Sequence, residues 1–185
     1  NYLFKQFGGV ASTSIQKNIF QSDPMYFYID IDILFSIGER GMERVFEYGG
    51  RLESVKPVGS MFMEYYWFKN PEKYSQNYDI LLIGQNISNA YDREDKFTQF
   101  MDDYYDCFKW LVKFKQENPD YLIGIMHHAS AGIDEIQDKI INGTDIDILD
   151  KYDNTYKAAF SAKCNVTYGS TMGYELIGHN KPVVF

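Results

Sequence analysis

The chain has 185 residues, of which 45% are hydrophobic and 17% aromatic, and its formal net charge is -8. This apolar content is ample for a packed core in one domain or two small ones, so it excludes an intrinsically disordered protein. The negative charge argues against nucleic acid or an anionic membrane as the main partner, because both repel an acidic protein. A local basic pocket for one diphosphate is compatible with it.

The two cysteines, Cys107 and Cys164, are far apart and match no metal-ligand spacing. They indicate a reduced, cytoplasmic protein without a disulfide framework. No run of about 18 apolar residues occurs, so no transmembrane helix is expected. Both ends of the sequence fall within apolar runs, and the final run is predicted to be a buried strand. We therefore expect a segment of a longer protein, whose other parts could bring it to the inner face of a membrane.

The first part of the chain alternates short apolar runs with polar connections. Residues 26–37 (YFYIDIDILFSI) alternate and then become continuously apolar, which is typical of strands. Met42, Val45 and Phe46 have helical spacing, and a Gly-Gly pair ends that helix. The predicted elements are a strand before the loop at 6–9, a polar connection at 12–21, strands within 26–37, a helix at 39–48, a strand at 55–58 and an aromatic connector at 61–78.

From residue 78 onward the pattern becomes regular, with buried strands and amphipathic helices in turn. The predicted strands are 78–83, 121–126, 144–149, 164–168 and 183–185, and the predicted helices are 93–118, 132–141, 154–163 and 172–177. The long helix has an apolar stripe of Phe97, Phe100, Met101, Tyr104, Phe108, Leu111, Val112 and Phe114. Strands that alternate with helices imply an α/β fold with a parallel sheet and crossover helices.

The loops that follow these strands are expected to meet. In parallel sheets, ligands bind beyond the carboxyl ends of the strands. Three such loops carry glycine, amide, imidazole or hydroxyl groups, at 84–86, 127–130 and 168–171. The spacing therefore predicts a ligand site at this edge of the sheet.

The last of these loops, Gly169-Ser170-Thr171, precedes a predicted helix. A serine or threonine there caps the helix, and the free N–H groups of the first turn can face a phosphate. A capped helix without a ligand fits the pattern equally well. Glu175 lies one turn further on, where its carboxylate can accept hydrogen bonds from ribose hydroxyls. The alternative for Glu175 is a solvated helical glutamate.

Two histidines end the strand at 121–126. Neighbouring residues on a strand point to opposite sides, so one of His127 and His128 should face the rim, and a two-histidine metal site is not expected. The rim histidine could donate to a phosphate or polarise a leaving group. Two Asp-Ile-Asp triplets, at 30–32 and 145–147, are similar to the metal-binding DxD of some sugar transferases. Both precede apolar runs rather than turns, so we expect no metal there.

The segment 161–185 (SAKCNVTYGSTMGYELIGHNKPVVF) resembles GT-B glycosyltransferases of the bacterial surface or capsular polysaccharide type. Its pattern is a helix end with small residues, a strand, Tyr-Gly-Ser-Thr, a glycine two residues on, a glutamate and a Gly-x-x-x-Pro strand. Related segments occur in teichoic-acid glycerophosphotransferases and UDP-N-acetylglucosamine 2-epimerases. Upstream, the similar segments are 32–38, 55–60, 78–86 and 121–128.

The resemblance implies a GT-B fold. Residues 1–75 would be the closing part of a first, acceptor-side α/β domain with its connector. Residues 76–185 would be a Rossmann-type domain that binds the nucleotide-sugar donor, without a metal or a cofactor. The family's usual His-Pro at the second strand end is His127-His128 here, so the resemblance leaves open which of the two takes the place of the family's histidine.

The resemblance also implies roles for single residues. Ser170 and Thr171, after Gly169, would bind the diphosphate, and Glu175 would bind ribose or sugar hydroxyls. His127 would contact the donor phosphate and act in catalysis. Gly84 with Gln85 would line the cleft. Glu39 is the candidate acidic residue on the acceptor side.

The expected function is that of a cytoplasmic enzyme that transfers a sugar from a nucleotide sugar to a surface polysaccharide, glycan or lipid-linked acceptor. Two other enzymes fit the same motifs: a nucleotide-sugar 2-epimerase and a glycerophosphotransferase that uses CDP-glycerol. A non-catalytic nucleotide-sugar-binding domain is a further alternative.

Overall fold

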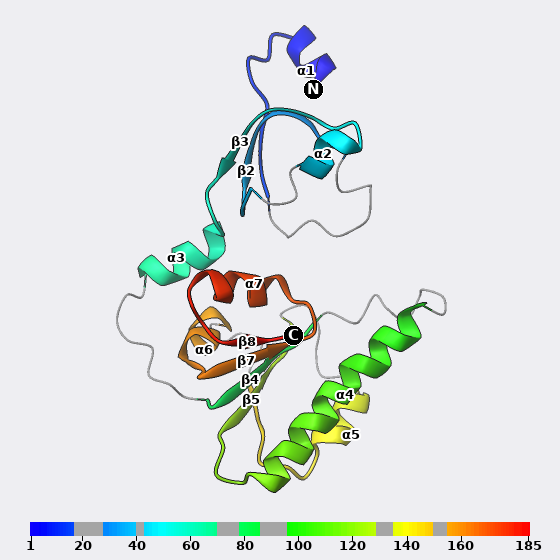
Figure 1. Cartoon of the computed structure of the whole chain (residues 1–185), viewed down its shortest axis with the longest axis vertical. Coiled ribbons are helices and arrows are strands. Elements are labelled where there is room, and N and C mark those ends of the chain that lie inside the picture. Colours follow the sequence, from blue (N-terminus) through cyan, green and yellow to red (C-terminus); the bar gives the residue numbers. More distant parts are fainter. Residues whose placement is uncertain (17–27, 40–42, 70–77, 86–95, 129–134, 150–154) are drawn as a thin grey trace. The chain divides into compact units, whose positions relative to one another are not determined.

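The computed structural model describes residues 1–16, 28–39, 43–69, 78–85, 96–128, 135–149 and 155–185 (Figure 1). The chain forms two compact units, Asn1–Lys69 and Asn70–Phe185, which we call unit 1 and unit 2 and describe separately. The division predicted after residue 75 falls in the segment 70–77, outside the described residues.

Unit 1 is built on a three-stranded parallel sheet in the order β1-β2-β3. Its elements are α1 (Tyr2–Gln6), β1 (Thr13–Ile15), β2 (Asp30–Ser36), α2 (Glu43–Glu47), β3 (Arg51–Pro57) and α3 (Met61–Lys69). Every second residue of β2 is buried, namely Asp32, Leu34 and Ser36. This alternation is the signature of a half-buried strand and confirms the strand predicted within 26–37.

Three predictions in unit 1 are wrong. The start of the chain is the helix α1 rather than a strand, because the backbone N–H of Lys5 finds an acceptor locally, in the carbonyl of Asn1 at 3.0 Å. The polar connection contains β1, whose exposed residues join the sheet through the backbone ladder with β2. The aromatic connector begins with the helix α3, because the Oγ of Ser60 accepts a hydrogen bond from the N–H of Met63 at 3.2 Å.

Unit 2 contains a five-stranded parallel sheet in the order β6-β5-β4-β7-β8. Its strands are β4 (Ile80–Ile83), β5 (Ile123–Met126), β6 (Asp147–Leu149), β7 (Cys164–Thr167) and β8 (Val183–Val184). Its helices are α4 (Lys96–Glu117), α5 (Glu135–Ile141), α6 (Thr155–Ser161) and α7 (Thr171–Gly178). The predicted α/β fold with parallel sheets is confirmed, and the strand order corresponds to the first five strands of the Rossmann-type order 3-2-1-4-5-6.

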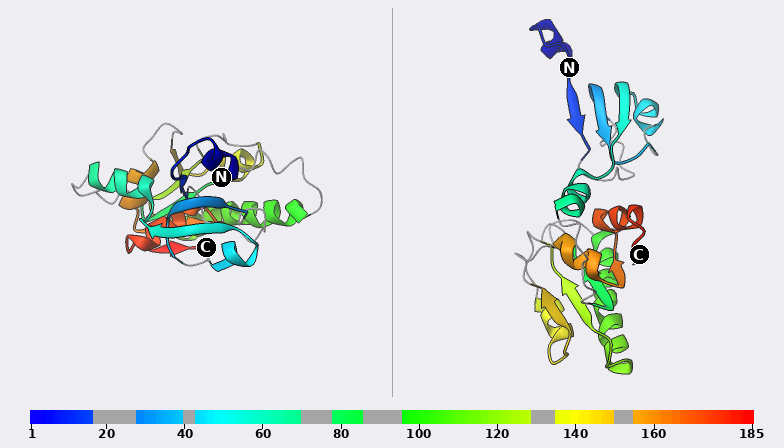
Figure 2. Two further views of the ribbon diagram at one scale, coloured as in Figure 1. Left: turned by 90° about the horizontal axis from the view of Figure 1, so that it is seen from above. Right: turned by 90° about the vertical axis from the view of Figure 1, so that its left-hand side faces the viewer.

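Helices cover both faces of this sheet (Figures 1 and 2). Side chains of α4 and α5 share one buried cluster with Ile80, Leu82, Ile123, Ile125 and Val166 of the sheet. On the other face, the Nδ2 of Asn165 in β7 donates to the carbonyl of Ala159 in α6 at 3.1 Å. The predicted stripe of α4 is confirmed at Met101, Tyr104, Phe108 and Leu111, which are buried, whereas the side chains of Phe97 and Phe100 lie outside the described part.

The last strand differs from its prediction. β8 was expected to be buried, but among the strands of the described residues it pairs with β7 alone, and Val184 keeps 54% of its surface exposed. The ring of Phe185 lies beside that of Tyr174 of α7, with 4.7 Å between centroids. Among the helices of the described residues, none combines the length and the apolar character needed to cross a bilayer.

The packing of α4 makes a testable distinction between two leucines. Leu111 is fully buried in the core, whereas Leu122 is 57% exposed. Leu111→Ala should lower the free energy of unfolding by about 2–5 kcal/mol, because it removes buried methyl groups and leaves a cavity. Leu122→Ala is the matched control and should change it by less than about 0.5 kcal/mol. Urea unfolding measures both, and equal losses would contradict the assigned core.

Candidate functional site

The carboxyl ends of three adjacent strands lie level in unit 2. Ile83 of β4 pairs with Met126 of β5 on one side and with Thr167 of β7 on the other. The loops after these strands therefore begin side by side, which confirms the predicted meeting of Gly84, His127 and Tyr168. Asn86 and residues 129–130, also assigned to these loops, lie outside the described residues.

The chain changes direction between β4 and β7. From β4 it builds outward through β5 to β6, and it then returns to the other side of β4 to form β7 and β8. The helix that follows β4 therefore covers one face of the sheet, while the helix that follows β7 covers the other (Figure 1). In open parallel sheets, this topological switch point is where ligands bind.

Gln85 joins the two loops at the switch point. Its backbone N–H donates to the hydroxyl of Tyr104 in α4 at 2.9 Å. Its side-chain Nε2 donates to the backbone carbonyl of Tyr168, after β7, at 2.6 Å. A Cβ built on Gly169 would lie 3.4 Å from the same Nε2. The structure thus brings Gln85 and Gly169, both predicted donor-site residues, into contact.

Gly84 has no room for a side chain. A Cβ at this position would lie 2.8 Å from the carbonyl oxygen of Met126 and 3.1 Å from the hydroxyl of Tyr104. Its N–H donates to that same carbonyl at 2.7 Å. Gly84 therefore lets the loop after β4 pass directly against the end of β5, beside His127.

The turn before α7 is capped as predicted. Ser170 has extended backbone angles, and its Oγ accepts a hydrogen bond from the N–H of Met172 at 3.3 Å. The N–H of Ser170 in turn donates to the Oγ1 of Thr167 at 3.1 Å. Gly169 has a φ of 100°, a conformation that favours glycine. Thr171 is the first residue of the helix, so its hydroxyl and the first-turn N–H groups lie at the rim, and anion binding there stays a prediction.

Glu175 is buried, with 8% of its surface exposed, and its Oε2 accepts a hydrogen bond from the hydroxyl of Tyr156 in α6 at 3.2 Å. The alternative of a solvated helical glutamate is therefore wrong. Burial of a carboxylate costs free energy unless hydrogen bonds compensate it, and the hydroxyl of Tyr156 supplies one such bond to Glu175. The predicted contact of Glu175 with ribose hydroxyls stays a prediction.

The other two candidates differ in their surroundings. His127 is buried, whereas His128 is exposed, and which of the two faces the rim stays a prediction. Glu39 is exposed and follows β2 in unit 1. The catalytic roles of His127 and Glu39 stay predictions.

Three residues that contact the candidate site were missed in the sequence, namely Tyr104, Tyr156 and Asp103. Tyr168 belongs to a predicted rim loop, but the hydrogen bond from its hydroxyl to the Oδ2 of Asp103, at 2.9 Å, was not predicted. That hydrogen bond to Asp103 and burial raise the pKa of Tyr168, so its phenol keeps its proton at neutral pH. In a chain with 16 tyrosines, Tyr104 was assigned to an apolar stripe, and only its hydroxyl contact distinguishes it.

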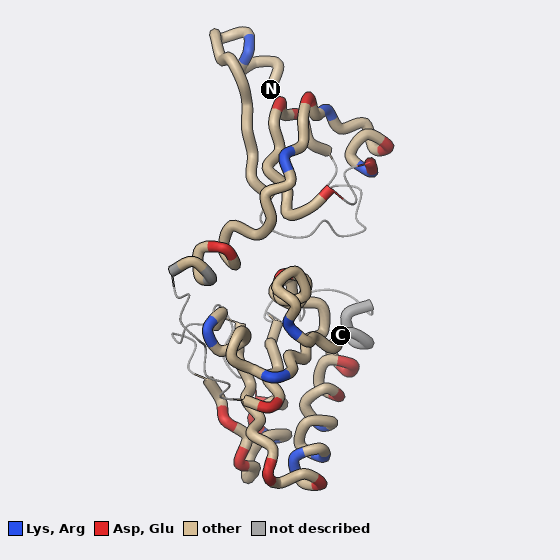
Figure 3. Tube along the Cα trace, turned by 60° about the vertical axis from the view of Figure 1, so that its left-hand side comes forward, with Lys and Arg blue, Asp and Glu red and all other residues tan. Residues whose placement is uncertain are grey.

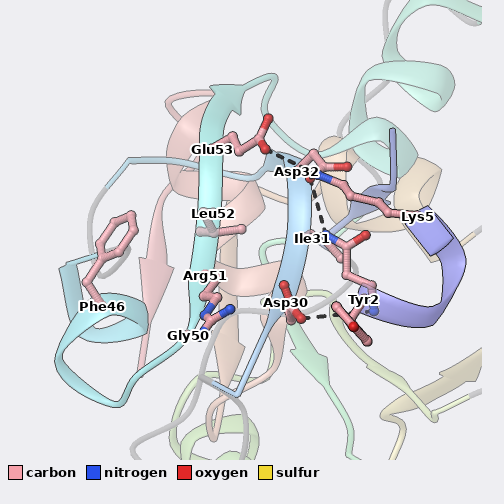
Figure 4. A pocket seen from close by; sticks show the side chains of 11 residues that line it. Tyr2, Lys5, Asp30, Ile31, Asp32, Phe46, Gly50, Arg51, Leu52 and Glu53 are labelled. Atoms are coloured by element: carbon pink, nitrogen blue, oxygen red, sulfur yellow. Dashed lines mark hydrogen bonds and ion pairs between the residues drawn. The ribbon is translucent and has the colours of Figure 1, made fainter. Parts of the chain in front are cut away.

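The first Asp-Ile-Asp triplet lines a pocket of about 470 Å³ in unit 1 (Figure 4). Lys5 reaches from α1 to the carboxylates of Asp32, at 2.5 Å, and Glu53, at 3.3 Å. Asp32 also accepts hydrogen bonds from the N–H and the Oγ of Ser12 and from Asn1. The pKa of Asp32 is held well below its usual range, mainly by the hydrogen bond from Lys5. The carboxylate therefore fastens α1 and the start of β1 to β2.

The second triplet is also engaged elsewhere, since Asp145 forms an ion pair with buried Lys115 at 3.1 Å. The described residues contain no group of three or more side chains that could hold a metal ion. Acidic and basic positions are interspersed along the described trace rather than gathered by sign (Figure 3). The structure thus offers no support for a metal site at either triplet.

A second pocket, of about 510 Å³, lies at the carboxyl ends of the strands of unit 1. Its lining is mostly apolar and aromatic, and consists of Ile15, Gln16, Ile37, Ser60, Met61, Phe62, Tyr65 and Tyr66. Ile15 ends β1, while Ile37 and Ser60 follow β2 and β3. Unit 1 therefore also has a hollow at the edge of its sheet where ligands of α/β proteins bind.

No model of a known protein family matches this chain, and no curated protein is significantly similar to it.

The close approach at Gly84 can be tested with two glycine variants. Gly84→Ala should lower the free energy of unfolding by about 1–3 kcal/mol, because the new methyl group meets a backbone oxygen that cannot move aside easily. Gly178→Ala, in a helix with open space around the new Cβ, should be neutral or slightly stabilising. Thermal and urea unfolding compare the two, and a neutral Gly84→Ala would contradict the packing of the rim.

The Asp32 cluster predicts a pH dependence. Because the pKa of Asp32 is lowered in the folded chain, its contribution to stability is complete above its unfolded pKa of about 4 and is lost as the pH falls. The Asp32→Asn variant should therefore lose less stability than the wild type between about pH 5 and pH 2. Asp30→Asn, at a half-exposed carboxylate, is the control. Urea unfolding at each pH measures this, and parallel curves for wild type and Asp32→Asn would contradict it.

Proposed function

We propose that the chain belongs to a GT-B glycosyltransferase that moves a sugar from a nucleotide sugar to a surface polysaccharide or glycan acceptor. In this proposal, unit 2 binds the donor and unit 1 is the closing part of the acceptor-side domain. The observation that carries the proposal is the meeting of Gly84, Gln85, His127 and the capped turn at Ser170 at the switch point of a parallel sheet.

The donor would be held through its diphosphate. The N–H and the hydroxyl of Thr171 would supply hydrogen-bond donors at the positive end of the helix dipole, next to the N–H groups of Met172 and Gly173, which donate within the turn to Ser170. Such groups stabilise negative charge that grows on the diphosphate as it leaves. Glu175, one turn along the helix, would accept from the hydroxyls of the ribose or the sugar.

The transfer needs a general base for the acceptor hydroxyl and a hydrogen-bond donor for the leaving diphosphate. The oxygen of an acceptor hydroxyl bonds to the anomeric carbon, and the bond from that carbon to the diphosphate oxygen breaks. The nucleoside diphosphate leaves with the electron pair, and the acceptor proton passes to a carboxylate, for which we propose Glu39. His127 would donate a hydrogen bond to a phosphate oxygen of the leaving group.

The pocket at the carboxyl edge of unit 1 supports an acceptor with an apolar part. Glu39 lies two residues beyond Ile37, which lines that pocket. Aromatic and aliphatic side chains dominate the lining, so the lipid portion of a lipid-linked acceptor suits it better than a phosphate group. This arrangement would leave the acceptor hydroxyl near the base.

The same diphosphate grip would serve a nucleotide-sugar 2-epimerase, a CDP-glycerol glycerophosphotransferase or a non-catalytic binding domain. These alternatives differ in product rather than in nucleotide binding. Incubation with a nucleotide sugar or CDP-glycerol, followed by product analysis, separates transfer to an acceptor, epimerisation, glycerophosphate transfer and absence of turnover.

Nucleotide binding gives the direct test. UDP, CDP and GDP are titrated into the chain by calorimetry, and one of them should bind. Thr171→Val and Glu175→Gln, which change no more than a hydroxyl and a charge, should each raise its Kd about tenfold, the loss of roughly one hydrogen bond in a binding site. Thr13→Val, at an exposed residue of β1, is the control and should leave the Kd unchanged. Absence of binding to all three nucleotides would refute the donor site.

A further inference from the structure

We propose that Tyr104 and Tyr168 are positioning residues of the nucleotide site, because they close a ring of hydrogen bonds that fixes two of its loops to α4. The proposal rests on the proposed function and deepens it. It concerns residues that touch the two loops and that are not themselves expected to touch the nucleotide.

The ring consists of three hydrogen bonds and one covalent link. The hydroxyl of Tyr104 accepts from the N–H of Gln85 at 2.9 Å, and the Nε2 of Gln85 donates to the carbonyl of Tyr168 at 2.6 Å. The hydroxyl of Tyr168 donates to the Oδ2 of Asp103 at 2.9 Å. Asp103 and Tyr104 are neighbours in α4, so the circuit returns to its start.

The ring is anchored in the core on one side. Tyr104 is fully buried, and its aromatic ring packs edge to face on Phe108 with 5.1 Å between centroids. The centroid of the aromatic ring of Tyr168 lies 6.5 Å from that of Tyr104. Because the side chain of Tyr104 is packed in the core, its hydroxyl holds the backbone N–H of Gln85, and with it the loop after β4, in one position.

On the other side, the ring reaches the predicted phosphate-binding turn. Tyr168 is followed directly by Gly169 and Ser170, the cap of α7. A Cβ built on Gly169 would lie 3.4 Å from the Nε2 of Gln85. The hydrogen bond from that Nε2 to the carbonyl of Tyr168 therefore holds the backbone that leads directly into the turn at Gly169 and Ser170.

The topology explains why such a tie is needed. The elements after β4 and β7 leave toward opposite faces of the sheet, so the backbone ladder does not hold their loops together beyond Ile83 and Thr167. Hydrogen-bond donors aimed at a diphosphate lose much of their effect when they are misplaced by about 1 Å. The ring supplies the missing connection across the switch point.

The test uses Tyr104→Phe, Tyr168→Phe and Asp103→Ala, each of which removes one bond of the ring. Asp103→Asn keeps an acceptor and should restore the ring. Tyr121→Phe, in an exposed tyrosine of the same unit, is the matched control. The first measurement is amide hydrogen exchange of the chain without ligand, and the second is the Kd for the nucleoside diphosphate that the wild type binds.

In the three ring-breaking variants, peptides that cover 84–85 and 168–171 should exchange several-fold faster, while β4 and β5 stay protected. The Kd should rise about tenfold in each variant, and the double variant Tyr168→Phe with Asp103→Ala should lose no more than the single ones, since both break the same bond. Asp103→Asn and Tyr121→Phe should behave as the wild type.

Two results would overturn the proposal. Unchanged exchange at 84–85 and 168–171 in Tyr104→Phe would show that the ring does not hold the loops. Faster exchange throughout unit 2 in the same variant would assign the hydroxyl to general stability instead. If the wild type binds none of the nucleotides, the donor site fails and the nucleotide-positioning role falls with it, while exchange in the unliganded chain still decides whether the ring orders the loops.

Discussion

The pairing of β4 with a parallel strand on each side is the constraint on which unit 2 depends. All four residues of β4 are buried, and its ladder sets the register of both β5 and β7. A strand covered on both faces and paired on both edges cannot slip by one residue without exposing apolar side chains and burying polar ones. The level ends of the three strands, and hence the position of the candidate site, follow from this pairing.

The same strand order sends the elements after β4 and β7 toward opposite faces of the sheet. Loops that leave a sheet toward opposite faces share no backbone ladder, yet the proposed diphosphate site would need donors held in one geometry. The side-chain amide of Gln85 joins the loops after β4 and β7, and the hydroxyl of Tyr104 fixes the first of them to α4. A tyrosine hydroxyl also serves the buried carboxylate of Glu175, which accepts a hydrogen bond from Tyr156.

Unit 1 shows how burial changes the meaning of a sequence motif. The Asp-Ile-Asp triplet at 30–32 has the spacing of a metal site, but Asp32 points inward and is surrounded by Lys5 and Ser12. A buried carboxylate with such partners has few lone pairs left for an ion. Its role is to connect an exposed strand and a short helix to the sheet, while the carboxyl edge of that sheet carries the apolar pocket.

Local pattern was sufficient to predict the strands and helices of unit 2, because an alternation of short buried strands and amphipathic helices allows only a parallel α/β sheet. It was also sufficient for the cap at Ser170 and for the meeting of Gly84, His127 and Gly169, since parallel strands end at one edge. It failed for α1 and β1, which depend on local and ladder hydrogen bonds of the backbone rather than on apolar side chains.

Only the tertiary structure could identify Tyr104, Tyr156 and Asp103, and the contact that the hydroxyl of Tyr168 makes. Their hydroxyl and carboxylate contacts join residues 19 to 65 positions apart in the chain. The exposure of Val184 in β8 was likewise beyond reach, because an apolar run does not reveal how much of its strand other elements will cover. Periodicity reports which side of an element faces the core, whereas a hydrogen bond between distant residues exists only once the chain has folded.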